Sequence, residues 1–137
     1  MSSWSKSLIK LASYEVETLQ KRLGEIVDRR MSCQARIDHL MAQAQVETIA
    51  ARGDTIATMG LPSFLQGVKV RKAQIEAEIE QILIEEAGAR DALAQAFETQ
   101  KKYEQVAENM RLADVKLEGQ RETAALDELG LRRSSNP

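Results

Sequence analysis

The sequence contains few aromatic residues, few prolines and a single cysteine. Aromatic residues make up 4% of its 137 residues, and there are two prolines. Because aromatic side chains each bury a large area in globular cores, this shortage argues against a globular fold. Cys33, as the single cysteine, excludes an internal disulfide and suits a reducing cytoplasm. The residues that are abundant, such as Ala, Leu, Ile, Glu, Gln, Lys and Arg, mostly favour helices.

The sequence also lacks an excess of one charge and any long apolar run. Its 19 basic and 21 acidic residues give a net charge of -2, which favours neither nucleic acid nor an anionic membrane as a partner. No apolar run approaches the roughly 18 residues that a membrane-spanning helix needs. The first residues lack the apolar stretch of a secretion signal. We therefore expect a cytoplasmic protein with no direct membrane insertion.

Residues that interrupt helices gather in one short stretch, which holds Gly53, Asp54, Gly60 and Pro62. Proline lacks a backbone N–H and disfavours a helical residue before it, whereas glycine readily takes the left-handed conformation that ends a helix. The pattern predicts a single domain, 1–137, made of a helix over about 5–51, a connection over about 52–62, a second helix over about 63–129 and a disordered tail over 130–137.

Apolar residues recur along both predicted helices at alternating steps of three and four. The first row is Ile9, Ala12, Val16, Leu19, Leu23, Ile26, Arg30, Cys33, Ile37, Leu40, Ala44 and Glu47. The second row is Val68, Lys72, Ile75, Ile79, Ile82, Glu86, Ala89, Leu93, Ala96, Gln100, Tyr103, Ala107, Met110, Asp114 and Leu117. Rows of this kind are typical of a coiled coil. We predict an all-α fold: one long helical hairpin, a two-stranded antiparallel coiled coil with a longer second helix.

Folding the chain at the predicted connection also predicts which residues face each other. The numbers of facing residues should sum to about 115 or 116, which places Leu40 opposite Ile75 and Arg30 opposite Glu86. A slip of one heptad would leave both charges of the second pair without a partner. Because an unpaired charge in a buried seam is costly, we expect Arg30 and Glu86 to touch and to set the register.

The sequence offers no constellation of residues for catalysis. His39 is the single histidine, and a hairpin has no cleft in which other ligands would converge on it. Cys33 occupies a seam position, where it is expected to be a small buried hydrophobe. The glycines are isolated and form no phosphate-binding loop. We expect no catalytic, cofactor-binding or metal-binding residue, no cofactor and no enzymatic activity.

Several apolar residues outside the paired seam are candidates for partner binding. Those around the connection form either a plug that closes the hairpin or a contact tip for a partner. The second helix should project beyond the start of the first from about residue 111, so its apolar residues are either frayed or reserved for another protein. Trp and Tyr are favoured binding anchors. The candidates are Trp4, Tyr14, Met59, Leu61, Phe64, Met110, Leu112, Val115, Leu117 and Leu126.

The opening segment resembles a known family. The stretches Trp4-Ser5-Lys6-Ser7-Leu8-Ile9-Lys10-Leu11 and Tyr14-Glu15-Val16-Glu17-Thr18-Leu19-Gln20-Lys21-Arg22-Leu23 are similar to the start of the flagellar export-apparatus FliJ family, particularly its α-proteobacterial forms. The length of the chain, the single hairpin and the longer second helix agree with this resemblance.

The resemblance implies a soluble component of the flagellar type III secretion system. It implies a central stalk that binds the export ATPase hexamer, contacts the cytoplasmic domain of the membrane export gate and helps to handle export chaperones. Carried onto this chain, the segments from Trp4 to Leu23 and from Met110 to Leu129 would enter the ATPase ring, and Met59 to Leu65 would face the gate. Such a protein would be cytoplasmic and peripheral at the inner membrane. The alternatives are a cytosolic chaperone or adaptor and a dimerising scaffold.

Overall fold

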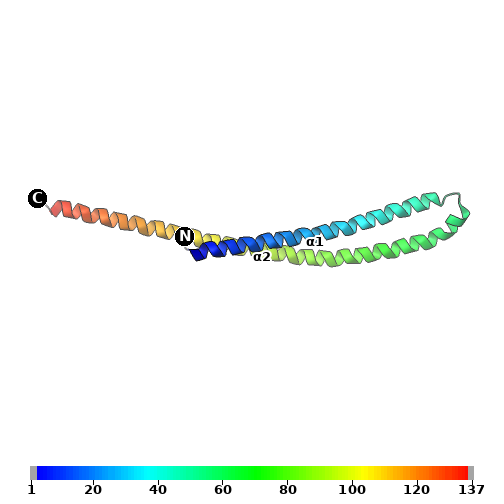
Figure 1. The fold of residues 1–137 in the computed structure, drawn as a ribbon, viewed down its shortest axis with the longest axis horizontal. Coiled ribbons are helices and arrows are strands. Elements are labelled where there is room, and N and C mark those ends of the chain that lie inside the picture. Colours follow the sequence, from blue (N-terminus) through cyan, green and yellow to red (C-terminus); the bar gives the residue numbers. More distant parts are fainter. Residues whose placement is uncertain (1–2, 136–137) are drawn as a thin grey trace. The chain divides into compact units, whose positions relative to one another are not determined.

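The protein folds into two long helices, as the computed structural model in Figure 1 shows. The structure describes residues 3–135, and this part of the chain contains α1, Ser3–Ala50, and α2, Thr55–Ser135, with no strand. The two helices pack against each other in opposite directions. The predicted all-α fold class, a helical hairpin, is therefore confirmed.

The contacts within the chain divide it into two compact units. One unit is Glu17–Leu93, and the other combines Met1–Val16 with Ala94–Pro137. Each unit contains a part of α1 and a part of α2, so each has its own length of paired seam. The single domain that the sequence predicts therefore stays a prediction.

The link between the helices lies within Glu17–Leu93 and is shorter than predicted. Gly53 has a φ of 81°, the left-handed conformation predicted for a helix end, and α1 stops just before it. Asp54 then caps α2, because its Oδ1 accepts hydrogen bonds from the backbone N–H groups of Ile56 and Ala57 at 3.1 and 3.2 Å. One left-handed glycine and one capping aspartate thus reverse the chain in four residues, 51–54.

The predicted connection over 52–62 was too long at its second end, because α2 already begins at Thr55 and contains Pro62. Proline inside a helix removes one hydrogen bond, yet here the helix continues through it. Ala57 and Leu61 are half-buried within this first part of α2. We attribute the early start to the Asp54 cap and to this burial, neither of which depends on Pro62.

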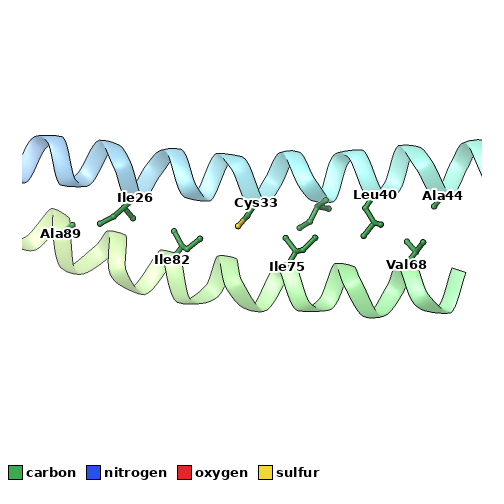
Figure 2. Close-up of a cluster of buried hydrophobic side chains, with 9 residues drawn as sticks. Ile26, Cys33, Leu40, Ala44, Val68, Ile75, Ile82 and Ala89 are labelled. Carbon is green, nitrogen blue, oxygen red and sulfur yellow. The ribbon is translucent and has the colours of Figure 1, made fainter. Parts of the chain in front are cut away.

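The seam of the unit Glu17–Leu93 consists of the residues that the two rows predict. Figure 2 shows side chains from α1 and α2 alternating along the seam and pointing toward one another. The buried cluster comprises Ile26, Cys33, Ile37, Leu40, Ala44, Val68, Ile75, Ile82 and Ala89, with Leu23 and Ile79 packed against it. Each of these residues belongs to a predicted row.

The α1 row departs from the prediction at its end. Glu47 is exposed, and the buried face continues instead through the half-buried Thr48 and the buried Ala51. A straight helix has 3.6 residues per turn, so a row stepped by three and four drifts around it unless the helices supercoil. A step of four from Ala44 corrects this drift and leaves the carboxylate of Glu47 in water.

The second unit pairs the first residues of α1 with α2 from Ala94 onward. Its buried residues are Ser5, Ala12, Val16 and Ala107. Ser5 Oγ lies 3.8 Å from Met110 Sδ, a side-chain hydrogen-bond contact that fits the predicted register. From residue 111 to residue 134, every residue of α2 is exposed. We call this segment, 111–134, the arm.

The arm remains helical beyond the predicted end at residue 129, because α2 runs through Gly130 to Ser135. The predicted disordered tail therefore overlaps helix over 130–135, and its last two residues, 136 and 137, lie outside the described part. An interior glycine costs only about 1 kcal/mol. Arg132 pairs with Glu128 at 3.1 Å, and basic residues near a helix C-terminus are favourable.

Candidate partner-binding surfaces

Three ion pairs join α1 to α2 inside the unit Glu17–Leu93. Arg29 Nη1 donates to both carboxylate oxygens of Glu85, at 3.1 and 3.0 Å. Arg36 Nη1 lies 2.8 Å from Glu78 Oε2. The third pair joins Arg30 to Glu86. All three lie within one residue of the predicted register.

Arg30 and Glu86 touch as the sequence predicts. Arg30 Nε donates to Glu86 Oε1 at 3.1 Å, and Glu86 Oε2 lies 3.9 Å from Arg90 Nε on the same helix. Glu86 is buried, with 9% of the residue exposed, so its carboxylate is the most desolvated charge of the seam. The predicted contact between Arg30 and Glu86 is therefore present, whereas its role in setting the register stays a prediction.

Neither Cys33 nor His39 has surroundings that suggest chemistry. Cys33 is a buried free thiol in the seam, with Sγ 3.6 Å from Glu78 Oε2. His39 is exposed and lines an open groove with Leu40 and Arg71. Within residues 3–135, no three His, Cys, Asp or Glu side chains come together in a way that would hold a metal ion. No described helix has a segment apolar enough to cross a membrane.

The unit that contains the arm gathers most of the predicted partner-binding residues. Trp4 and Tyr14 are exposed on α1, and Met110 is half-buried against it. The remaining residues of this group are exposed on the arm: Leu112, Val115, Leu117 and Leu126. Figure 1 shows this part of α2, coloured from yellow-orange to red, continuing beyond the first residues of α1. The predicted projection from about residue 111 is therefore present within this unit.

The other unit carries the remaining candidates at its chain reversal. Met59 is exposed, Phe64 is partly exposed at 36%, and Leu61 is half-buried. A plug that closes the hairpin would be buried, and Met59 is not. The neighbouring Ile56 is the most exposed large apolar side chain of the described residues, at 84%. A contact tip agrees better with this exposure than a complete plug does.

The predicted candidates omitted several exposed apolar residues. Leu11 lies on α1 between Trp4 and Tyr14, and Leu129 and Leu131 lie near the end of the arm. Leu129 lies within the predicted second helix and belongs with the other apolar residues of the arm. Leu131 lies beyond Gly130, which was taken as the end of the helix, although α2 continues to Ser135.

One charged pair stands where the paired seam gives way to the arm. Arg111 donates to both carboxylate oxygens of Glu108, at 2.7 and 3.0 Å. These hydrogen bonds lower the pKa of Glu108 below its ordinary value, and the same contact raises the pKa of Arg111. Both side chains are exposed, so the pair supports the helix locally and holds Arg111 along the arm.

Comparisons with known proteins agree over nearly the whole chain. The family model described as Flagellar FliJ protein matches residues 6–137. The chain is similar to a Flagellar FliJ protein of Caulobacter vibrioides, strain NA1000 / CB15N, with 46% identity over 135 residues that cover 98% of this chain and 97% of the relative. The corresponding protein of strain ATCC 19089 / CIP 103742 / CB 15 gives the same values. No solved structure matches the chain.

Proposed function

We propose a function for this chain, which belongs to the flagellar FliJ family. As a member of that family it is a component of flagellar protein export and not an enzyme. The finer proposal is that it is a coupling component of the flagellar type III export apparatus. In this proposal it binds the export ATPase ring and the export gate, and it assists the export of flagellar proteins.

The observation that carries this proposal is the exposed arm of α2. Burial along α2 ends at Met110, and every residue from 111 to 134 is exposed although the arm contains several large apolar side chains. An extended apolar surface on a helix is a common site for another protein. Trp4 and Tyr14 lie in the same unit and are also exposed. We assign the ATPase contact to this unit.

A second contact is proposed at the chain reversal of the unit Glu17–Leu93. Ile56 and Met59 expose apolar side chains close to the Asp54 cap, and Phe64 and Leu65 are partly exposed nearby. Large exposed apolar side chains near a helix end suit a partner that packs over that end. We assign the contact with the cytoplasmic domain of the export gate to this tip, which would hold the protein at the cytoplasmic face of the inner membrane.

The proposed mechanism is conformational coupling without catalysis. A ligand shifts a conformational equilibrium only when it binds the two states with different affinity. A helical protein that contacts both the ATPase and the gate couples their conformational states if its affinity for each partner depends on the state of that partner. The paired seam then supplies the connection between the two contacts, and export chaperones are further partners for the exposed surfaces.

The test is co-purification of the full chain with the export ATPase from the same organism. We expect a complex that is lost when the chain is truncated after Met110, because this truncation removes the arm and leaves the buried residues of both units in place. Circular dichroism should show that the truncated protein remains helical. A complex that survives the truncation would refute the assignment to the arm.

A full chain that is folded but forms no complex would refute the ATPase contact altogether. That result would favour a cytosolic chaperone or adaptor, or a dimerising scaffold. Binding of many export clients without the ATPase would identify the adaptor, and concentration-dependent light scattering would identify the scaffold.

A further inference from the structure

The arm carries two different rows of residues at coiled-coil spacing. The seam row continues from Met110 through Asp114, Leu117, Arg121, Ala124, Glu128 and Leu131. A second row, which we call the outer row, consists of Leu112, Val115, Gly119, Glu122, Leu126, Leu129 and Arg133. Successive residues of a helix are about 100° apart, so Leu112 lies about 200° around the helix from Met110. Met110 contacts α1 through Ser5, and the outer row therefore faces away from α1.

The apolar face of α2 changes where α1 ceases to cover it. Up to Met110 the seam row is mainly apolar, and its residues are buried or half-buried. Beyond Met110, charged and apolar residues alternate along the seam row. The outer row behaves in the opposite way. Upstream it is polar, with Glu98, Lys101, Gln105 and Glu108, and from Leu112 it becomes apolar. Beyond Met110 the seam row keeps Leu117, Ala124 and Leu131, and the outer row adds four apolar residues that have no counterpart at its positions over 98–108.

A second copy of this chain fits the outer row poorly in the parallel direction. Parallel helices would place Glu122 against Glu122 of the copy at a core position. They would also bring Arg111 beside Lys116 of the copy, because these residues flank the row on its two sides. Like charges at core and flanking positions disfavour such pairing.

The antiparallel direction fails for a similar reason. The register that pairs all four apolar residues sets Leu112 opposite Leu129, and Val115 opposite Leu126. In that register Arg111 lies beside Arg132 of the copy at both ends. The two Glu122 carboxylates also fall in adjacent central layers. Arg111 and Arg132 are each paired with a carboxylate of the same helix, which weakens this repulsion. The pattern of charge nevertheless disfavours both simple self-pairings and points to a different protein.

We propose that the outer row is the docking face for one amphipathic helix of another protein. The partner helix would present large apolar residues to Leu112, Val115, Leu126 and Leu129, and a basic residue to Glu122. Its flanks would carry acidic residues beside Arg111, Lys116 and Arg132. Gly119 has open space around it, so a bulky partner side chain fits at that point. Complementary charge of this kind selects a partner and its register.

This inference rests on the proposed function, because the partner used to test it is the export ATPase. The arm offers closely matched variants for the test. Leu126 of the outer row is 68% exposed and Leu131 of the seam row is 70% exposed. The variant Leu126→Lys and the control Leu131→Lys therefore add the same charge at equally exposed leucines.

We expect the outer-row variant to weaken binding of the full chain to the export ATPase by about tenfold or more, as expected when buried apolar anchors are replaced by charge. The seam-row control should bind within about twofold of the unchanged protein, as expected for substitutions outside an interface. Circular dichroism should show equal helicity for both. Equal loss in both variants, or loss in the seam-row control alone, would overturn the assignment of the face. Absence of binding by the unchanged protein is a different result, which refutes the proposed function and this inference with it.

The charge of the partner has its own test. Glu122→Lys should reduce binding by about tenfold if a basic residue faces Glu122, a factor typical of reversing one charge at an interface. Asp127→Lys, which changes the charge equally at a position in neither row, should not. Tighter binding by Glu122→Lys would overturn the proposed partner chemistry. Sedimentation of the free chain should show a monomer, and a dimer that Leu126→Lys dissociates would overturn the inference in favour of a second copy.

Discussion

The seam of the unit Glu17–Leu93 and the arm of the other unit have the same spacing of apolar residues but opposite exposure. In the seam, Ile26, Ile75 and Ile82 are buried by the facing helix. In the arm, leucines at equivalent spacing are exposed because no part of α1 lies against them. A heptad row therefore specifies a helix and its apolar face. It does not specify which helix, if any, covers that face.

The charges of the two regions teach a second lesson. In the seam, Glu86 is buried and has Arg30 within 3.1 Å. In the arm, the seam row carries Asp114 and Arg121 at positions open to water. A charge is costly at a row position only when that position is desolvated. Charged residues thus become frequent in the row where burial ends.

The largest difference is expected from removal of a buried side chain. Ile26, which is 2% exposed, loses its packing in Ile26→Ala, and the free energy of unfolding should fall by about 2–3 kcal/mol. Leu126→Ala in the arm should change it by less than about 0.5 kcal/mol. Urea denaturation followed by circular dichroism measures both. Equal effects would show that the arm is buried in the free protein.

A smaller effect is expected from the charged pair of the seam. Arg30→Gln and Glu86→Gln should each lower the free energy of unfolding by about 1 kcal/mol, because each leaves a partly buried charge without its partner. The charge reversal Arg30→Glu/Glu86→Arg should recover part of the loss. If thermal denaturation gives an unchanged Tm for both single variants, the pair does not set the register.

The cap of α2 should contribute a similar or slightly smaller amount. Asp54→Ala removes the acceptor for the N–H groups of Ile56 and Ala57 and should cost about 1 kcal/mol. Asp54→Asn keeps an acceptor and serves as the matched control. Thermal denaturation of both variants measures their loss of stability. Equal losses of stability in Asp54→Ala and Asp54→Asn would show that the charge of Asp54, and not its capping hydrogen bonds, stabilises the helix.

The smallest effect concerns Glu108 and Arg111 at the base of the arm. The folded pKa of Glu108 is lowered from 4.5, so the pair supports the helix above that pH and loses this support as the pH falls through the lowered pKa. An NMR titration of the Glu108 carboxyl should give a pKa below 4.5, and Arg111→Gln should raise it. An unchanged pKa in Arg111→Gln would show that Arg111 is not the cause.

The sequence predicted the seam well because burial in a two-helix fold is nearly one-dimensional. Steps of three and four along α2 identified residues from Val68 to Met110, and each of them is buried or half-buried. The contact between Arg30 and Glu86 followed from the same register. The connection was predicted less well, because Pro62 was taken as a boundary although an aspartate eight residues earlier caps the helix.

The candidate partner surfaces were only partly predictable. Exposure of the arm followed from the unequal helix lengths, so Leu112, Val115, Leu117 and Leu126 could be named. The outer row, which separates Leu117 from the other three, became visible only once the Ser5–Met110 contact placed α1 on one side of α2. One face of α2 is an inner or an outer face only relative to α1. The sequence alone does not give the position of α1 around α2.

The sequence by itself determined the helices and the apolar rows, because helix propensity and heptad spacing are local properties of the chain. Its opening residues indicated the family through their resemblance. The tertiary structure alone decided where α2 begins, how far the seam is buried and which face of the arm is turned away from α1. These features depend on the Gly53 turn, the Asp54 cap and the desolvation that one helix imposes on the other.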